Sequence, residues 1–125
     1  MPYKILVVDD DKMVRKLFMD LLKKENHIVK SVSSGEEALA ILNKEPFDAV
    51  LLDIKLKGMS GLDTLKEIKN KYPQTIVIMI TGFGYDEDLV LKSNELGCSG
   101  YLSKDLDLSQ IMENLKVFIS KAREK

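Results

Sequence analysis

Short apolar runs alternate with longer amphipathic segments along the whole chain, and this alternation constrains the fold more than any other feature. The apolar runs cover residues 5–8, 28–32, 49–52, 76–80 and 101–103. Each run is followed by a segment whose apolar residues recur at helical spacing, as Val14, Phe18 and Leu22 do after the first run. Five such units in succession predict a doubly wound α/β fold, in which helices cover both faces of a parallel sheet.

Local signals place the ends of several of the expected helices. Asp11 is a suitable N-cap for the first helix, because Asp favours helix N-termini. Ser34 followed by Glu37 three residues later is typical of a capping box, which predicts that the second helix begins there. The fourth helix is expected over residues 86–96, with Gly97 just after its C-terminus. These signals agree with the alternation of strands and helices, and no linker or low-complexity segment interrupts it.

Length and composition exclude several classes of protein. With 125 residues, the chain is expected to form one domain over residues 1–125. The net charge of −1 gives no general attraction to nucleic acid. No apolar run is long enough to span a bilayer, and the N-terminus lacks the layout of a signal peptide. Cys98 and His27 are the only residues of their types, which excludes a cluster of thiolates or histidines around zinc and favours a reducing, cytoplasmic setting.

Chemically active side chains follow four of the five predicted strands. They are Asp9, Asp10 and Asp11 after the first strand, Asp53 after the third, Thr81 at the end of the fourth and Lys104 after the fifth. In an open parallel sheet, ligands bind outside the carboxyl ends of the strands, so these distant residues should meet at one edge. Acids, a hydroxyl and an ammonium in one place suit phosphoryl chemistry around a hard cation.

The expected site contains the parts that phosphoryl transfer needs. Clustered carboxylates repel one another unless a cation lies among them, and Mg²⁺ prefers oxygen ligands of this kind. A carboxylate can also act as a nucleophile and become an aspartyl phosphate. During transfer, the phosphoryl group carries negative charge delocalised over its oxygens, which Mg²⁺ and Lys104 would balance. Thr81 would donate a hydrogen bond to a phosphoryl oxygen.

At these positions the sequence resembles the receiver domain of response regulators. The resemblance rests on Asp9-Asp10 after an apolar run, Asp53 after Leu51-Leu52, Gly61 eight residues later, Thr81-Gly82, and the segment from Tyr101 to Lys104. It extends from Lys4 to the last helix. It implies a flavodoxin-like fold with strand order 2-1-3-4-5.

The resemblance also implies a role for each residue of the site. Asp53 is the phosphoacceptor and a metal ligand. Asp10 binds Mg²⁺ directly, Asp9 mainly through water, and the backbone carbonyl of Lys55 is a further ligand. Lys104 and Thr81 hold the phosphoryl oxygens.

The same resemblance implies a switch and a set of partners. Movement of Thr81 toward the phosphoryl group would let Tyr101 turn inward and change the face made by the fourth helix, fifth strand and fifth helix. The phosphoryl donor would be a sensor histidine kinase or a phosphotransfer protein, and that face would meet a downstream protein. The chain would not be an enzyme in the usual sense, since it would catalyse only its own phosphorylation and dephosphorylation. No helix-turn-helix follows the last helix, so we expect output through protein contacts or through a domain absent here, with no direct contact of this domain with nucleic acid. The short apolar runs predict no contact with a membrane.

Two residues depart from the pattern of receiver domains. Lys57 and Asp105 stand where proline is common. The lysine–proline bond of the family is typically cis, whereas a cis bond before a non-proline residue costs about 3 kcal/mol. We therefore expect a trans bond between Lys104 and Asp105, with an adjusted loop.

Three other functions remain open at this stage. A haloacid-dehalogenase-like phosphatase would use Asp9 as its nucleophile, because Asp9-Asp10-Asp11 contains an Asp-x-Asp motif. A flavodoxin-like electron carrier is disfavoured, because three acids stand where a phosphate-binding loop would be needed. A receiver-like module that binds partners without phosphorylation is the third reading, and Asp105 keeps it open.

Several residues are expected to have only structural or solvent-facing roles. Cys98 is expected to be a small packing residue. His27 is expected to face solvent in a turn, and the lysines at 69–71 to lie in a solvated helix end.

Overall fold

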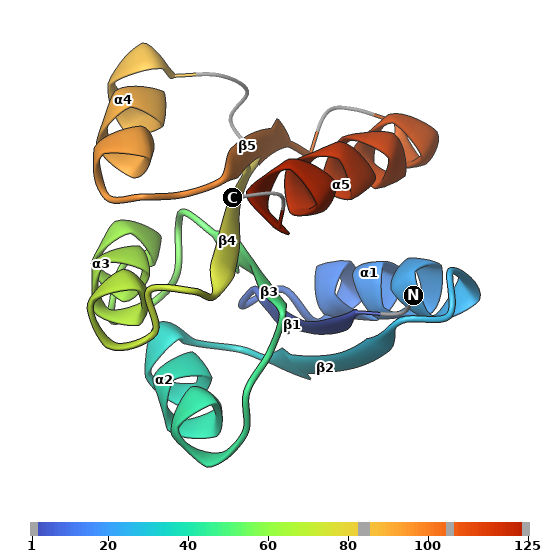
Figure 1. Cartoon of the computed structure of the whole chain (residues 1–125), viewed down its shortest axis with the longest axis horizontal. Helices are drawn as coiled ribbons and strands as arrows, with labels where there is room; N and C mark the ends of the chain where they lie inside the picture. The colour runs from blue at the N-terminus through green and yellow to red at the C-terminus, as the bar shows by residue number, and fades with distance from the viewer. Residues whose placement is uncertain (1–2, 83–85, 105–106, 124–125) are drawn as a thin grey trace.

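The computed structural model describes residues 3–82, 86–104 and 107–123, and strands alternate with helices through these segments (Figure 1). The strands are β1 (Lys4–Val8), β2 (Ile28–Val32), β3 (Ala49–Asp53), β4 (Ile76–Thr81) and β5 (Gly100–Ser103). The helices are α1 (Lys12–Lys24), α2 (Gly35–Lys44), α3 (Gly61–Lys71), α4 (Glu87–Glu95) and α5 (Leu108–Arg123). The predicted succession of strands and helices is therefore confirmed, with most boundaries within one residue of those expected.

All neighbouring strands are parallel, and the sheet has the order β2-β1-β3-β4-β5. This is the doubly wound arrangement that the sequence predicted. The three central strands are β1, β3 and β4, which are the three runs with almost no polar residues. Every residue of β3 and β4 is buried. Their continuous apolar character follows from burial on both faces.

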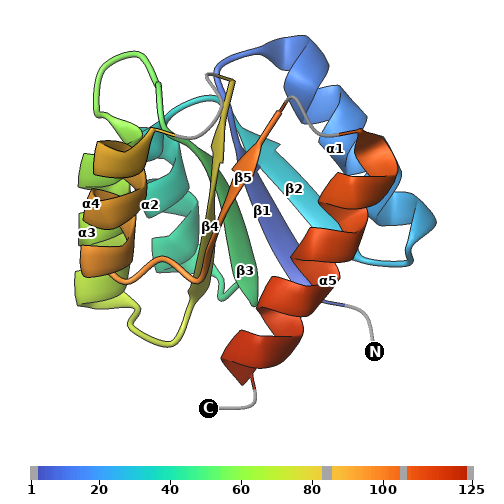
Figure 2. The same cartoon turned by 90° about the horizontal axis from the view of Figure 1, so that it is seen from above.

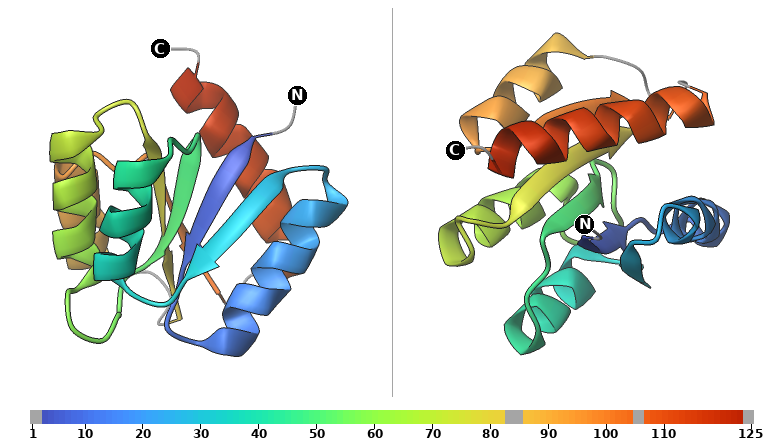
Figure 3. Two further views of the ribbon diagram at one scale, coloured as in Figure 1. Left: turned by 90° about the horizontal axis from the view of Figure 1, so that it is seen from below. Right: turned by 45° about the vertical axis from the view of Figure 1, so that its right-hand side comes forward.

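Helices α1 and α5 cover one face of the sheet, and α2, α3 and α4 cover the other (Figures 2 and 3). Side chains alternate between these two layers along each strand, so Ile5 and Val7 belong to one core cluster while Leu6 and Val8 belong to the other. Both clusters stabilise the fold through buried apolar area, at roughly 1.5–3 kcal/mol for each large side chain. Cys98 packs against the second cluster, as expected.

The predicted helix ends are confirmed by hydrogen bonds. The Asp11 carboxylate accepts from the backbone N–H of Met13 at 2.9 Å, and Ser34 Oγ accepts from the N–H of Glu37 at 3.1 Å. Gly97 follows α4 with φ +95°, a left-handed conformation in which glycine carries no steric penalty.

Two of the residues expected to face solvent do not. His27 is half-buried, its Nδ1 accepts from the backbone N–H of Tyr3 at 3.0 Å, and the two rings stack with centroids 5.5 Å apart. Lys69 is also half-buried, because its ammonium donates to the carbonyl oxygens of Pro73 and Thr75. Both predictions were wrong: the partner of His27 lies 24 positions away, and the partners of Lys69 are backbone carbonyls four and six positions on, which the polar pattern of side chains does not reveal.

Within the described segments, no helix has the length and apolar character needed to cross a membrane.

Candidate functional site

The carboxyl ends of β1, β3, β4 and β5 meet at one edge of the sheet, where the loops after β1 and β3 leave it (Figure 2). Asp9 directly follows β1, Asp53 ends β3, Thr81 ends β4 and Lys104 directly follows β5. The parallel register brings these ends together, with Asp53 opposite Ile80 and Thr81 opposite Ser103. The predicted gathering of these residues at one edge is therefore present in the structure.

Three carboxylates form an acidic cluster at this edge. Asp9, Asp10 and Asp53 each offer an oxygen atom, and these atoms all lie within 4.8 Å of one another. Asp9 and Asp53 are buried, with 3% and 6% of their surface exposed, whereas Asp10 is exposed. Asp11 does not join this group, because its side chain caps α1.

Lys104 supplies positive charge to the acidic cluster. Its Nζ lies 2.8 Å from Asp9 Oδ2 and 3.6 Å from Asp53 Oδ2. Its backbone N–H donates to the carbonyl oxygen of Thr81 at 2.7 Å, which fixes the start of the loop after β5. Burial acts to lower the pKa of Lys104, but the hydrogen bond to Asp9 and the charge of Asp53 outweigh burial and raise it. Lys104 is therefore a fixed cation at this edge.

The carboxyl group of Asp53 resists ionisation. Burial and the nearby charge of Asp9 raise its pKa from 3.8 to about 6, although the charge of Lys104 acts in the opposite direction. The backbone N–H of Lys55 also donates to this carboxylate, which favours its ionised form. One ammonium beside three carboxylates thus leaves negative charge that is not balanced.

This arrangement fits a divalent cation such as Mg²⁺. Mg²⁺ binds carboxylate and carbonyl oxygens and keeps several waters, so it needs only a few protein ligands. The cluster offers three carboxylates. Burial is the largest cause of the raised pKa of Asp53, and the charges of Asp9 and Asp10, which a cation would neutralise, add to it. The backbone of Lys55 adjoins the cluster, and its carbonyl remains a predicted ligand.

The main chain around the cluster is held by contacts that the sequence did not predict. Asp9 Oδ1 accepts from the backbone N–H of Asp11 at 2.9 Å, and the Arg15 guanidinium donates to the carbonyl oxygen of Asp9 at 2.7 Å. No sequence motif points to Arg15, which reaches back from the first turns of α1. Gly61 has a steric role, because a Cβ there would lie 2.3 Å from the Asp53 carbonyl oxygen.

The two residues of the predicted switch are both buried. Thr81 is 1% exposed at the end of β4. Tyr101 is 6% exposed and belongs to the core cluster beneath α3 and α4, where Leu89 and Val90 pack against the same cluster. Both residues are thus buried on neighbouring strands, and their role as a switch stays a prediction.

Of the two residues that depart from the receiver pattern, the structure describes only Lys57. The side chain of Lys57 is exposed in the loop between β3 and α3. The peptide bond between Lys104 and Asp105 lies outside the described residues, so its predicted trans form stays a prediction.

Comparison with known proteins identifies relatives over nearly the whole chain. A family model described as the response regulator receiver domain matches residues 5–116. Sporulation initiation phosphotransferase F of Bacillus subtilis is 35% identical over 116 residues, which are 93% of this chain and 93% of that protein. The transcriptional regulatory protein CpxR of Klebsiella pneumoniae is 37% identical over 119 residues, but this chain spans only 50% of its length.

Solved structures show the same fold. A CheY-like receiver domain protein from Methanospirillum hungatei superposes with a TM-score of 0.91 at 27% identity, covering 99% of this chain and 98% of that one. A structure described as the BeF3-activated DrrB receiver domain gives a TM-score of 0.84 at 34% identity, covering 96% and 99%. The family model and the solved structures thus indicate the same kind of domain.

Proposed function

Because the chain belongs to the response regulator receiver domain family of two-component systems, we propose that it takes a phosphoryl group onto Asp53 with the help of Mg²⁺. The observation that carries this proposal is the position of Asp53. Its buried carboxyl group lies in a cluster of three acids, with an ammonium 3.6 Å away. A nucleophile, oxygen ligands for a cation and a fixed positive charge thus meet at one place, as phosphoryl transfer requires.

The proposed transfer is a displacement at phosphorus. An oxygen of Asp53 forms a bond to the phosphorus of a phosphohistidine, and the bond from phosphorus to the imidazole nitrogen breaks. The nitrogen keeps the electron pair and takes up a proton. The carboxylates of the acidic cluster would hold Mg²⁺, which would supply positive charge to offset the negative charge of the transferring group.

The chain's own residues would orient the reacting groups. Asp9, Asp10 and Asp53 would hold the cation through carboxylates, together with the carbonyl of Lys55. The Lys104 ammonium would exchange its contact with Asp53 for one with a phosphoryl oxygen, which it can do because it is already at the edge. The hydroxyl of Thr81 would donate to another phosphoryl oxygen.

We infer the partners from the same family. The donor would be a histidine kinase or a phosphotransfer protein, and the reaction would take place in the cytoplasm. The downstream protein would bind the face made by α4, β5 and α5. Both helices of this face carry an exposed apolar side chain, Leu91 of α4 at 59% and Val117 of α5 at 45%, although α1 and β2 also expose apolar residues. The Bacillus subtilis relative is named a phosphotransferase, which supports transfer of a phosphoryl group as the chemistry.

The proposal is tested by the intact mass of the protein after incubation with acetyl phosphate. We expect one added phosphoryl group in the presence of Mg²⁺, and none when Mg²⁺ is removed or when Asp53 is replaced by Asn. The matched control is Asp20→Asn, an exposed acid on α1 that should leave the reaction unchanged. Equal incorporation in the wild type and in Asp53→Asn would contradict the proposal. A wild type that forms neither the adduct nor a complex with beryllofluoride would support a module that is not phosphorylated.

A further inference from the structure

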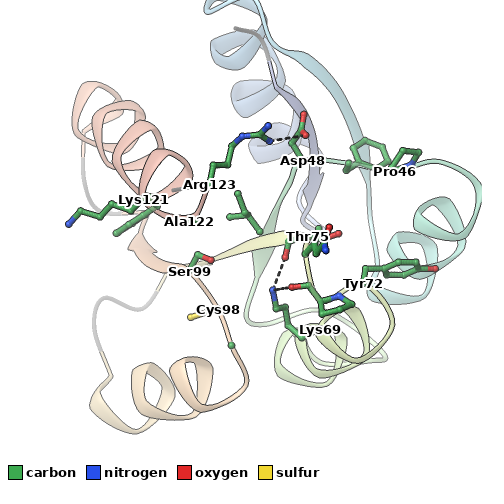
Figure 4. Close-up of a pocket in the computed structure, with 16 residues that line it drawn as sticks. Pro46, Asp48, Lys69, Tyr72, Thr75, Cys98, Ser99, Lys121, Ala122 and Arg123 are labelled. Atoms are coloured by element: carbon green, nitrogen blue, oxygen red, sulfur yellow. Dashed lines mark hydrogen bonds and ion pairs between the residues drawn. The ribbon is translucent and has the colours of Figure 1, made fainter. Parts of the chain in front are cut away.

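Charge is largely balanced at the amino ends of the strands, but it is not balanced at their carboxyl ends. A pocket of about 1240 Å³ opens where β3, β4 and β5 begin (Figure 4). In this pocket Arg123 lies 3.1 Å from Asp48, and Lys69 donates to two backbone carbonyl oxygens. The side chain of Lys121 points away from the pocket (Figure 4). At the carboxyl ends, by contrast, the Lys104 ammonium lies beside three carboxylates, so a cation has more charge to neutralise there.

Asp10 differs from the other two acids of the cluster in how its side chain is held. The Lys104 ammonium lies 2.8 Å from Asp9 and 3.6 Å from Asp53. Within residues 3–82, 86–104 and 107–123, no hydrogen bond or ion pair holds the exposed carboxylate of Asp10. The direction of the Asp10 side chain therefore depends on its own main chain.

Hydrogen bonds fix the peptide groups on both sides of Asp10. On one side, the Arg15 guanidinium donates to the carbonyl oxygen of Asp9 at 2.7 Å. On the other side, the backbone N–H of Asp11 donates to Asp9 Oδ1 at 2.9 Å. The two planar peptide groups that flank a residue define its φ and ψ, and thereby the direction of its Cβ. These two hydrogen bonds therefore direct the Asp10 side chain toward the cluster.

The position of Arg15 follows from its place in α1. Asp9 follows Val8, the last paired residue of β1, so the carbonyl oxygen of Asp9 takes a partner from outside the sheet. Side chains of a helix point back toward its N-terminus, which lets Arg15 reach a carbonyl six residues earlier. Arg15 is half-buried, and its charge also acts on Glu37 of α2, whose pKa is lowered mainly by hydrogen bonds from Ser33. An opposite charge on α2 thus favours this position of the guanidinium.

The charge of Arg15 on its own would oppose a cation at this site. Like charges repel, so a role through charge alone predicts tighter Mg²⁺ binding when Arg15 is replaced by a neutral residue. The hydrogen bond acts in the opposite direction, because it limits the directions that the Asp10 side chain can take. Contacts that orient a metal ligand typically change metal affinity by about 10- to 100-fold, whereas repulsion through water is screened by salt. The effect of the hydrogen bond should therefore exceed that of the charge.

We propose that Arg15 is a positioning residue for the cation site: by holding the carbonyl oxygen of Asp9, it orients the Asp10 carboxylate toward a divalent cation. This inference rests on the proposed function, because it concerns the same magnesium site. Arg15 acts through the main chain of Asp9 and Asp10 and does not itself bind the cation. It adds a residue of α1 to a site whose other side chains lie at the ends of strands.

The test is the affinity of the full chain for Mg²⁺ alone, measured by NMR from the shifts of the Asp10 and Asp53 backbone amides. Arg15→Met removes the donor and the charge but keeps the apolar stem and a good helix former. We expect this variant to raise the Kd about tenfold, which corresponds to about 1.4 kcal/mol. The matched control is Lys12→Met, which removes an exposed positive charge from the same helix and should leave the Kd unchanged or lower it.

Arg15→Lys distinguishes positioning from a general effect on the fold. Lysine keeps the charge and can donate one hydrogen bond to the carbonyl oxygen of Asp9, as Arg15 does. Its Kd should lie between those of the wild type and Arg15→Met, about threefold above the wild type. The Asp9 carbonyl carbon gives a second readout, since loss of the hydrogen bond in Arg15→Met should move its NMR signal upfield. Urea unfolding of each variant ensures that every Kd refers to folded protein.

The outcomes separate this inference from the proposed function. If the wild type binds Mg²⁺ and Arg15→Met binds it equally well or more tightly, the role of Arg15 is overturned and the proposed function stands. The role of Arg15 is also overturned if Lys12→Met weakens binding as much as Arg15→Met, or if Arg15→Lys binds no more tightly than Arg15→Met. A wild type that binds no Mg²⁺ overturns the magnesium site and this inference together.

Discussion

Replacing Asp53 by Asn should stabilise the metal-free protein at neutral pH. The pKa of Asp53 is 3.8 in its ordinary state and about 6 in the folded chain, where burial is the largest cause of the rise. Each unit of pKa difference corresponds to about 1.4 kcal/mol, so ionised Asp53 costs the fold roughly 3 kcal/mol. Asn has nearly the same shape and cannot ionise. It therefore removes this cost, while its side-chain oxygen can still accept from the N–H of Lys55.

The pH dependence distinguishes this reasoning from a general packing effect. Between pH 3.8 and about 6, the folded wild type holds a proton on Asp53 that the unfolded chain has released. As the pH rises through this window, the free energy of unfolding of the wild type therefore falls relative to that of the variant. Above about pH 6, the difference between the two proteins stays constant. Below pH 3.8 the carboxyl is neutral in both states, and the difference should vanish.

Urea unfolding in the presence of a chelator measures this difference at each pH. Asp20→Asn, the exposed control on α1, should show no comparable gain. Added Mg²⁺ should reduce the difference in the free energy of unfolding between the variant and the wild type, because Mg²⁺ binds and stabilises the ionised wild type. A variant that is no more stable than the wild type at neutral pH, or whose gain is the same at every pH, would refute the reasoning.

Three further predictions concern the surroundings of the acidic cluster. Gly61→Ala should destabilise the fold by about 1–3 kcal/mol, because the new Cβ would lie 2.3 Å from the Asp53 carbonyl oxygen. In the control Gly82→Ala, the new Cβ would lie 3.8 Å from the Lys104 side chain, and the free energy of unfolding in urea should change by no more than about 0.5 kcal/mol. Equal destabilisation by the two substitutions would contradict the steric role of Gly61. Asp11→Ala should cost about 1 kcal/mol by removing the N-cap of α1, and unchanged urea stability would show that the cap contributes nothing. Lys104→Met should raise the pKa of Asp53 above about 6, measured by carbon NMR of the carboxyl group, because it removes the ammonium 3.6 Å away; a lower pKa would contradict the assigned contact.

The fold could be predicted from the sequence because its local and global signals agree. The runs that form β1, β3 and β4 lack polar residues, and burial on both faces of the sheet explains why. Caps at Asp11 and Ser34 mark the starts of two helices. The gathering of Asp9, Asp53, Thr81 and Lys104 then follows from topology alone, because parallel strands bring their carboxyl ends to one edge.

What the sequence did not predict depends on contacts between distant residues. The contact of His27 with Tyr3 spans 24 positions, and nothing local to His27 indicates it. The sequence placed Lys104 near the acids, but only the structure shows that its shorter contact is with Asp9. The burial of Tyr101 likewise follows from the core residues packed around it. Such details depend on rotamers and packing that motifs do not encode.

The most direct test of the central proposal is to map the residue that carries the phosphoryl group. After incubation with acetyl phosphate and Mg²⁺, borohydride reduces an acyl phosphate and converts its aspartate to homoserine, which peptide mass spectrometry can locate. We predict homoserine at position 53 alone. Homoserine at position 9 would contradict the proposal and favour a phosphatase-like mechanism, in which Asp9 is the nucleophile.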